Sequence, residues 1–164
     1  MRCTLLVLFL LLPFSASAQN LTTTPATVQA GASQFLAPSD ARDALNPGLD
    51  LAVRGRLGGE GEVRPTINFG FERRWGSGTD LYGMDLRFGV RSTGPVILGL
   101  EGGMKLRSRK LGSTAGLSGS SLRPVAAAYA AYRSGRFQIG PTLTASVWED
   151  VAATAGVSVG YVIR

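Results

Sequence analysis

The chain has 164 residues, with 17 lysines and arginines, 11 aspartates and glutamates, and a formal net charge of +6. It contains no histidine and a single cysteine, Cys3. This composition excludes Ser-His-Asp catalysis, Cys-His catalysis and histidine metal sites, so no cofactor or metal is expected. The 22 glycines are many for a globular domain, and they lack the period of collagen.

The N-terminal segment predicts a cleaved secretion signal. Arg2 supplies the positive charge, residues 5–12 form a short apolar run, and Ala16 to Ala18 match a small-residue cleavage pattern. The apolar run is too short for a spanning helix, which needs about 20 residues. We therefore expect residues 1–18 to be a signal peptide and residues 19–164 to form one exported domain.

Most of the exported chain alternates apolar residues with polar or small ones, which predicts β-strands with one apolar face. In chain order the alternating segments are 49–57, 63–75, 82–91, 96–107, 122–133, 137–147 and 151–164. The clearest segment is the last one, whereas 122–133 is apolar on both faces and is the least clear.

The segment 27–36 is a weaker candidate for an eighth strand. Its case rests on closure, because an open sheet edge cannot sit in hydrocarbon and bacterial barrels have even strand numbers. The predicted fold is therefore all-β, an antiparallel up-and-down transmembrane β-barrel of eight strands.

The connections between the strands favour one orientation. With the C-terminus in the periplasm, the turns at Ser134-Gly135 and 92–95 fall on the periplasmic side. The long stretches Pro38 to Gly48 and Lys110 to Ser121 fall outside, as is usual for outer-membrane barrels. We expect these two outer loops to carry any recognition.

Alternation alone also fits a soluble periplasmic barrel that holds an apolar ligand in its lumen, with residues such as Phe69, Leu86 and Leu98 pointing inward. The membrane interpretation is favoured because the other face mixes charges of both signs with many glycines, which can fill a narrow lumen. Aromatic residues near the strand ends resemble the interfacial girdles of membrane barrels. The expected interface aromatics are Trp75, Tyr82, Phe137 and Tyr161.

The polar face of the strands predicts a charge network in the lumen. By parity its members are Asp50, Arg54, Arg56, Arg64, Glu72, Arg74, Asp85, Arg87, Arg91, Glu101, Lys105 and Arg107. One interpretation is an ion path through the barrel. The favoured interpretation is a plug of salt bridges, because eight strands leave little free bore and buried charges need partners.

With these patterns the chain resembles the small eight-stranded outer-membrane β-barrel proteins of Gram-negative bacteria. Tyr161 and the terminal alternation match the C-terminal signal that the barrel-assembly machinery reads in such families, whereas Ile163 and Arg164 depart from it. The resemblance implies residence in the bacterial outer membrane, with outer-membrane lipid and lipopolysaccharide as partners. Arg109 and Lys110 are candidates for contact with lipopolysaccharide phosphates.

The expected function is that of a structural or surface-interacting outer-membrane protein with a mostly closed, charged lumen. A small solute or ion channel is the alternative within the same fold. The resemblance also includes barrels that modify lipid A, but those that use a catalytic histidine match this chain poorly, so no enzyme is expected. Nucleic-acid binding fits poorly with an exported chain.

Overall fold

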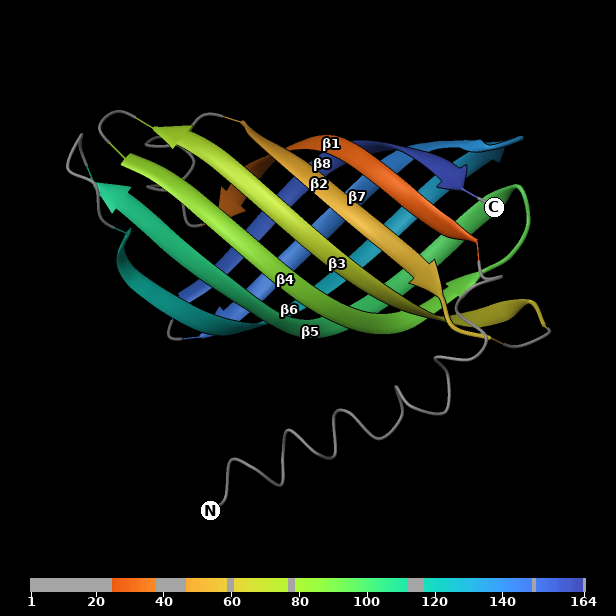
Figure 1. Cartoon of the computed structure of the whole chain (residues 1–164), viewed down its shortest axis with the longest axis horizontal. Coiled ribbons are helices and arrows are strands. Elements are labelled where there is room, and N and C mark those ends of the chain that lie inside the picture. Colours follow the sequence, from red (N-terminus) through yellow and green to blue (C-terminus); the bar gives the residue numbers. More distant parts are fainter. Residues whose placement is uncertain are drawn as a thin grey trace, which may run out of the picture.

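The computed structural model describes residues 25–37, 47–58, 61–76, 79–111, 117–148 and 150–163. The expected signal peptide lies outside the described residues. The eight strands form one closed antiparallel barrel in which each strand pairs with its neighbours in sequence (Figure 1). They are β1 (Ala26–Ala37), β2 (Gly48–Arg56), β3 (Val63–Gly76), β4 (Thr79–Ser92), β5 (Val96–Leu111), β6 (Leu117–Ser134), β7 (Phe137–Trp148) and β8 (Asp150–Ile163).

The first strand closes the barrel. β1 pairs with β2 from Ala26–Gly55 to Ser33–Gly48 and with β8 from Ala26–Ile163 onward. The weak candidate 27–36 is therefore a strand, and the predicted eight-stranded closure is confirmed. Among the described residues no helix is long and apolar enough to cross a bilayer.

Three connections and the end of β8 lie at one end of the barrel, here called the C-terminal end (Figure 1). These connections are the residues between β2 and β3, between β4 and β5, and between β6 and β7. Gly94 and Gly135 in two of these turns have φ angles of 118° and 60°, which glycine adopts without strain.

The interpretation of Lys110 to Ser121 as one long loop is wrong in its extent. β5 continues to Leu111 and β6 begins at Leu117, and the two strands stay paired as far as Lys110–Leu117. Polar and small residues can extend a hairpin beyond a membrane, because backbone pairing there needs no apolar face. In this hairpin, β5 and β6 therefore extend beyond the residues in which apolar and polar side chains alternate.

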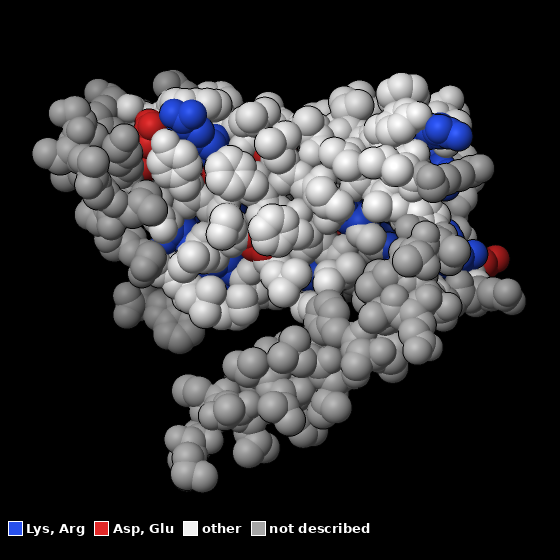
Figure 2. Space-filling model, viewed as in Figure 1, with Lys and Arg blue, Asp and Glu red and all other residues white. Residues whose placement is uncertain are grey.

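The apolar face of the strands points outward. Large apolar side chains are exposed on all eight strands, and Leu100 on β5 is the most exposed of them at 65%. Uncharged residues accordingly make up most of the face seen in Figure 2. The soluble alternative is wrong, because Phe69, Leu86 and Leu98, which it needs in the lumen, are exposed on the outside.

The strand with two apolar faces, β6, lines the lumen with apolar residues as well. Its buried positions are Val125, Ala127, Tyr129 and Ala131, while Leu122 and Tyr132 are exposed. Tyr129 and Ala131 pack with the buried Ile97 of β5 in a small apolar cluster. This cluster explains why alternation is weak here, since both faces of β6 meet apolar surroundings.

Candidate functional site: the charged lumen

Most of the charged residues of the lumen lie on β2 to β5. Every second side chain of these strands points inward, and most of the inward charged side chains are buried. Arg74 is fully buried and Glu72 is 3% exposed. A buried charge needs an opposite charge and hydrogen bonds to offset the loss of water. The arrangement of the partners therefore decides whether the lumen is filled or open.

Glu72 on β3 is the centre of one ionic cluster. Lys105 Nζ lies 2.7 Å from Glu72 Oε2, and Arg107 Nη2 lies 3.4 Å from Oε1. Arg74 Nη2 lies 3.5 Å from Glu72 Oε2. The two β5 cations reach this carboxylate across the intervening strand β4, where Gly83 leaves space for the Glu72 side chain.

Glu101 on β5 is the centre of a second cluster. Arg54 of β2 donates from Nε to Glu101 Oε1 at 2.5 Å and from Nη2 to Oε2 at 3.3 Å, as a bidentate pair. Arg87 Nη1 lies 3.5 Å from Glu101 Oε2, and Arg87 Nε donates to Asp85 Oδ1 at 2.7 Å. Because β2 and β5 are separated by two strands, the Arg54–Glu101 pair spans the lumen.

A third group extends the network toward the end of the barrel opposite the C-terminus. Arg74 donates to the backbone oxygen and to Oγ of Ser33 on β1, both at 2.6 Å. Ser33 Oγ in turn donates to Asp50 Oδ2. The guanidinium groups of Arg74 and Arg107 lie 4.8 and 5.5 Å from the centre of the Phe35 ring. This geometry suits cation–π attraction.

Glycines beside these clusters provide the space that the ionic side chains occupy. Gly70 and Gly83 are the register partners of Asp85 and Glu72 on the adjacent strands. A Cβ atom at Gly70 would lie 2.7 Å from Asp85 Oδ1, and one at Gly83 would lie 2.7 Å from Glu72 Oε1. The inward glycines thus let each carboxylate lie against the opposing strand.

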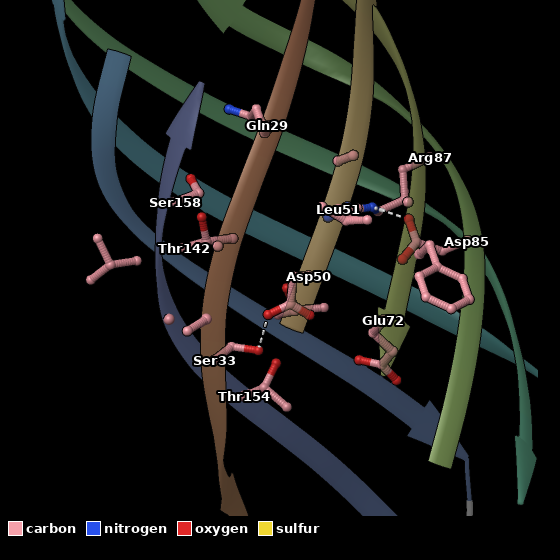
Figure 3. Close-up of a pocket in the computed structure, with 18 of the residues that line it drawn as sticks. Gln29, Ser33, Asp50, Leu51, Glu72, Asp85, Arg87, Thr142, Thr154 and Ser158 are labelled. Atoms are coloured by element: carbon pink, nitrogen blue, oxygen red, sulfur yellow. Dashed lines mark hydrogen bonds and ion pairs between the residues drawn. The ribbon is translucent and has the colours of Figure 1, made fainter. Parts of the chain in front are cut away.

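The opposite wall of the lumen, on β7 and β8, carries small hydroxyl residues such as Thr142, Thr154 and Ser158. Between the two walls lies a cavity of about 70 Å³, also lined by Gln29 and Arg54. Figure 3 shows Thr142 and Ser158 on the other side of the pocket from the Arg87–Asp85 contact. A polar cavity of this size has room for a few water molecules.

The predicted lumen residues fall into two groups in the structure. The nine that are brought together by ion pairs are Asp50, Arg54, Glu72, Arg74, Asp85, Arg87, Glu101, Lys105 and Arg107. The other three, Arg56, Arg64 and Arg91, form no ion pair with a carboxylate among the described residues. They lie toward the C-terminal end of the barrel.

The predicted interface aromatics lie on the outer surface at both ends. Trp75 and Tyr82 lie near the β3–β4 connection, where both rings are close to the guanidinium of Arg73. Arg73 Nη2 lies 3.3 Å from Asp80 Oδ2. At the C-terminal end, Phe137 and Tyr161 pack edge to face with 5.2 Å between their centroids.

Sequence reasoning missed several lumen residues because it considered formal charge alone. Gln29 accepts a hydrogen bond from Arg54 Nη1 at 2.8 Å, and the Tyr129 ring lies 3.9 Å from the Arg54 guanidinium. Ser33 and Phe35 were missed in the same way. The parity of β1 and β6 would have found all four, because each occupies an inward position. The side chains of Arg109 and Lys110 lie outside the described part of the chain.

Several solved structures have a fold similar to that of this chain. Ail, the attachment invasion locus protein of Yersinia pestis, in complex with the heparin analogue sucrose octasulfate, is 16% identical with a TM-score of 0.59, over 85% of this chain and 99% of that chain. The N-terminal β-barrel domain of Pseudomonas aeruginosa OprF is 12% identical with a TM-score of 0.59, over 85% and 97%. The outer membrane enzyme PagL is 12% identical with a TM-score of 0.55, over 82% and 98%. No protein-family model and no curated protein sequence matches the chain.

The chain therefore has the fold of the small eight-stranded outer-membrane β-barrels. At these identities the likeness concerns the fold alone. The neighbours include an enzyme as well as an attachment protein, so this chain's own surfaces have to carry any functional argument.

Proposed function

We propose that the protein is an integral protein of the bacterial outer membrane that acts through its outer surfaces and does not conduct solutes. The observation that carries this proposal is the combination of an apolar outer face with an ion-paired lumen. Exposed apolar side chains on so many strands would cost free energy in water and lose little in hydrocarbon. The closed barrel leaves no unpaired strand edge facing the lipid.

The closed lumen rests on ion pairs inside the bore. Arg54–Glu101 and Lys105–Glu72 each join strands that are not neighbours in the barrel, and all four side chains are almost fully buried. An ion or solute would have to break these pairs and leave charges without partners, at a cost of several kcal/mol for each buried pair. The cavity found between the walls is small, about 70 Å³.

Conductance of the purified protein in planar lipid bilayers tests this proposal. We expect no discrete opening events above the background of protein-free bilayers. The double variant E72Q/E101Q removes the central carboxylate of both clusters and serves as the positive control. We expect it to raise the bilayer conductance. Steady openings of the unaltered protein that disappear when Arg87 and Arg107 are neutralised would instead establish the channel alternative.

Outer-membrane lipid and lipopolysaccharide are the partners that we propose for the surface. Arg73, between Trp75 and Tyr82, presents a cation at an aromatic edge of the barrel, which suits the phosphates and sugars of a lipid headgroup region. Arg109 and Lys110 remain predicted contacts with lipopolysaccharide phosphates. Recognition of the final strand by the barrel-assembly machinery likewise remains a prediction, based on Tyr161 and the terminal alternation.

We also propose that the barrel has no enzymatic activity, although its fold is shared with the outer membrane enzyme PagL. The chain has no histidine to serve as a general base. The buried carboxylates Glu72 and Glu101 are each bound by cations, which leaves neither of them free to act on a substrate. Incubation with lipid A and mass spectrometry of the lipid products tests this, and any deacylated product would contradict the proposal.

A further inference from the structure

Four arginines gather inside the barrel at its C-terminal end. This basic mouth consists of Arg56 on β2, Arg64 on β3, Arg91 on β4 and Arg133 on β6. Arg64 and Arg91 are direct register partners on adjacent strands. The backbone N–H of Arg133 donates to the Pro95 oxygen at 2.7 Å, which holds the end of β6 beside the β4–β5 turn.

The basic mouth has no neutralising partner within the described part of the chain. The carboxylates of the lumen are engaged further inside, by the clusters around Glu72 and Glu101. Arg64 and Arg133 use their Nε atoms to donate to turn carbonyls, at 3.2 and 3.1 Å, which orients the groups without neutralising them. Arg91 is close enough to Arg56 and Arg133 to be repelled by both.

Buried hydrogen-bond donors without partners line the same end of the lumen. Thr66, Arg91, Tyr129 and Gln138 are each more than nine-tenths buried, and each has one polar atom without a hydrogen-bond partner: Thr66 Oγ1, Arg91 Nε, Tyr129 Oη and Gln138 Nε2. Register connects them to the basic mouth. Thr66 lies opposite Arg56, and Gln138 lies opposite Arg133.

Tyr129 joins this group across a glycine. Gly99 pairs with Arg91 on one side and with Tyr129 on the other, and the Tyr129 ring occupies the space that a side chain at Gly99 would take. A buried donor without an acceptor costs about 1–3 kcal/mol. Unpartnered nitrogens also occur on Arg73, Arg74, Arg87 and Arg107, but each of those guanidinium groups has a carboxylate partner. Arg91 has no such partner among the described residues, so the mouth is where an acceptor is missing.

We propose that the basic mouth binds a phosphate group. The donors come from four different strands, so the acceptor needs several oxygens that point in different directions, together with more than one negative charge. A tetrahedral phosphate meets both needs, whereas a carboxylate offers two oxygens in one plane. Guanidinium groups bind phosphate oxygens in pairs, and the Arg91 fork is buried where such hydrogen bonds are strongest.

Two sources can supply such a phosphate at this end of the barrel, which we expect to face the periplasm. One is a free phosphate or a small phosphorylated solute that enters the mouth from the water. The other is the headgroup of a phospholipid in the adjacent leaflet, reached by the outer members Arg64 and Arg133. The chemistry of the site is the same for both.

Calorimetric titration with inorganic phosphate tests the proposal, using the barrel in octyl glucoside, a detergent without phosphate, against sodium chloride at equal ionic strength. We expect saturable binding of phosphate and none of chloride. R133Q is expected to weaken phosphate binding about tenfold, the effect of losing one charge-assisted hydrogen bond. Arg133 lies at the rim, so the folded barrel is expected to tolerate this change.

R123Q is the matched control, because Arg123 lies on the same strand nearer the other end and forms no ion pair with a described carboxylate. Its Nε donates to Ser121 Oγ at 3.2 Å. We expect R123Q to leave phosphate binding unchanged within about twofold. The proposal is overturned if phosphate gives no saturable binding, or if R123Q weakens binding as much as R133Q does.

The Arg91 Nε–H resonance of ¹⁵N-arginine-labelled protein locates the bound phosphate and separates its two sources. A shift on adding phosphate in octyl glucoside supports the site, and no shift of this resonance at saturation contradicts it. The same resonance is then recorded in phosphatidylglycerol nanodiscs without added phosphate. If it has already moved from its position in phosphate-free octyl glucoside, the site binds the lipid headgroup. An unshifted resonance that still responds to added phosphate assigns it to a soluble ligand.

Discussion

At the residue scale, the inner wall combines large ionic side chains with glycines on the neighbouring strands. Gly89 and Gly103 lie opposite Glu101 and Arg87, just as Gly83 lies opposite Glu72. The many glycines therefore have a structural role, although glycine weakens strands in general. The sequence shows both glycines and charges on one face, but their register across strands is visible only in the folded barrel.

Glu72→Gln tests the weight of a single buried charge. The amide keeps the shape of the side chain but leaves Lys105 and the neighbouring arginines without their shared carboxylate. We expect a loss of about 3–5 kcal/mol in the free energy of unfolding, measured by urea denaturation in lipid vesicles. Asp80→Asn, which removes a partly exposed partner of Arg73, is the control and is expected to cost less than about 1 kcal/mol.

Two adjacent glycines offer a sharper comparison. A Cβ at Gly103 would overlap the backbone oxygen of Leu86 and lie 2.8 Å from the Arg87 Cα atom. At Gly102, on the lipid side, the nearest atom would be Val125 O at 3.9 Å. We expect Gly103→Ala to destabilise the barrel by about 1–3 kcal/mol and Gly102→Ala to change stability by less than about 0.5 kcal/mol. Equal effects in urea denaturation would refute this account of the glycines.

At the element scale, the bounds of a strand could be predicted from the sequence where one face of that strand contacts lipid. The segments 63–75 and 151–164 lie within a residue or two of β3 and β8, because a strand with lipid on one side keeps a strict period of two. The beginning of β6 was not predicted, since residues 117–121 pair with β5 without an apolar pattern. Tertiary pairing, and not local pattern, determines these positions.

A charge on the lipid-facing side of β5 measures how deeply that strand is immersed. Leu100 lies well within the run of outward apolar residues, whereas Val96 is the first residue of the strand, next to the turn. We expect Leu100→Arg to cost about 2–4 kcal/mol and Val96→Arg about 0–1 kcal/mol in vesicles. A larger cost at Val96 than at Leu100 would contradict this placement of the strand in the bilayer.

At the scale of the whole molecule, the two halves of the barrel complement each other. β2 to β5 contribute the ionic side chains, and β7, β8 and β1 contribute small inward residues such as Thr154 and Ser158, toward which those side chains extend. The sequence contains this division, because the charged alternation of β2 to β5 lies between the small-residue alternation of β1 and that of β7 and β8. The individual ion pairs could not be predicted, since Arg54–Glu101 spans two intervening strands, Lys105–Glu72 and Arg107–Glu72 span one, and all depend on the stagger of the closed sheet.

Closure also explains why the lumen and the basic mouth were not distinguished from the sequence. Parity places Arg54 and Arg91 on the same inner face, yet Arg54 is paired with Glu101, whereas Arg91 forms no ion pair with a described carboxylate. Arg54 and Arg91 differ in their position along the barrel axis. That position is determined by strand tilt and register, which cannot be deduced from the local sequence.

The central claim is that the apolar face of a closed barrel lies in lipid, and the depth of a spin label at Leu100 tests it most directly. In a Cys3→Ser background the chain has no other cysteine, so Leu100→Cys can carry one nitroxide, with Glu62→Cys in an exposed turn as the aqueous reference. In native outer membranes we expect the label at position 100 to be accessible to oxygen and protected from a water-soluble nickel complex, and the label at position 62 to show the reverse. Equal accessibility of both labels to the nickel complex would contradict the account.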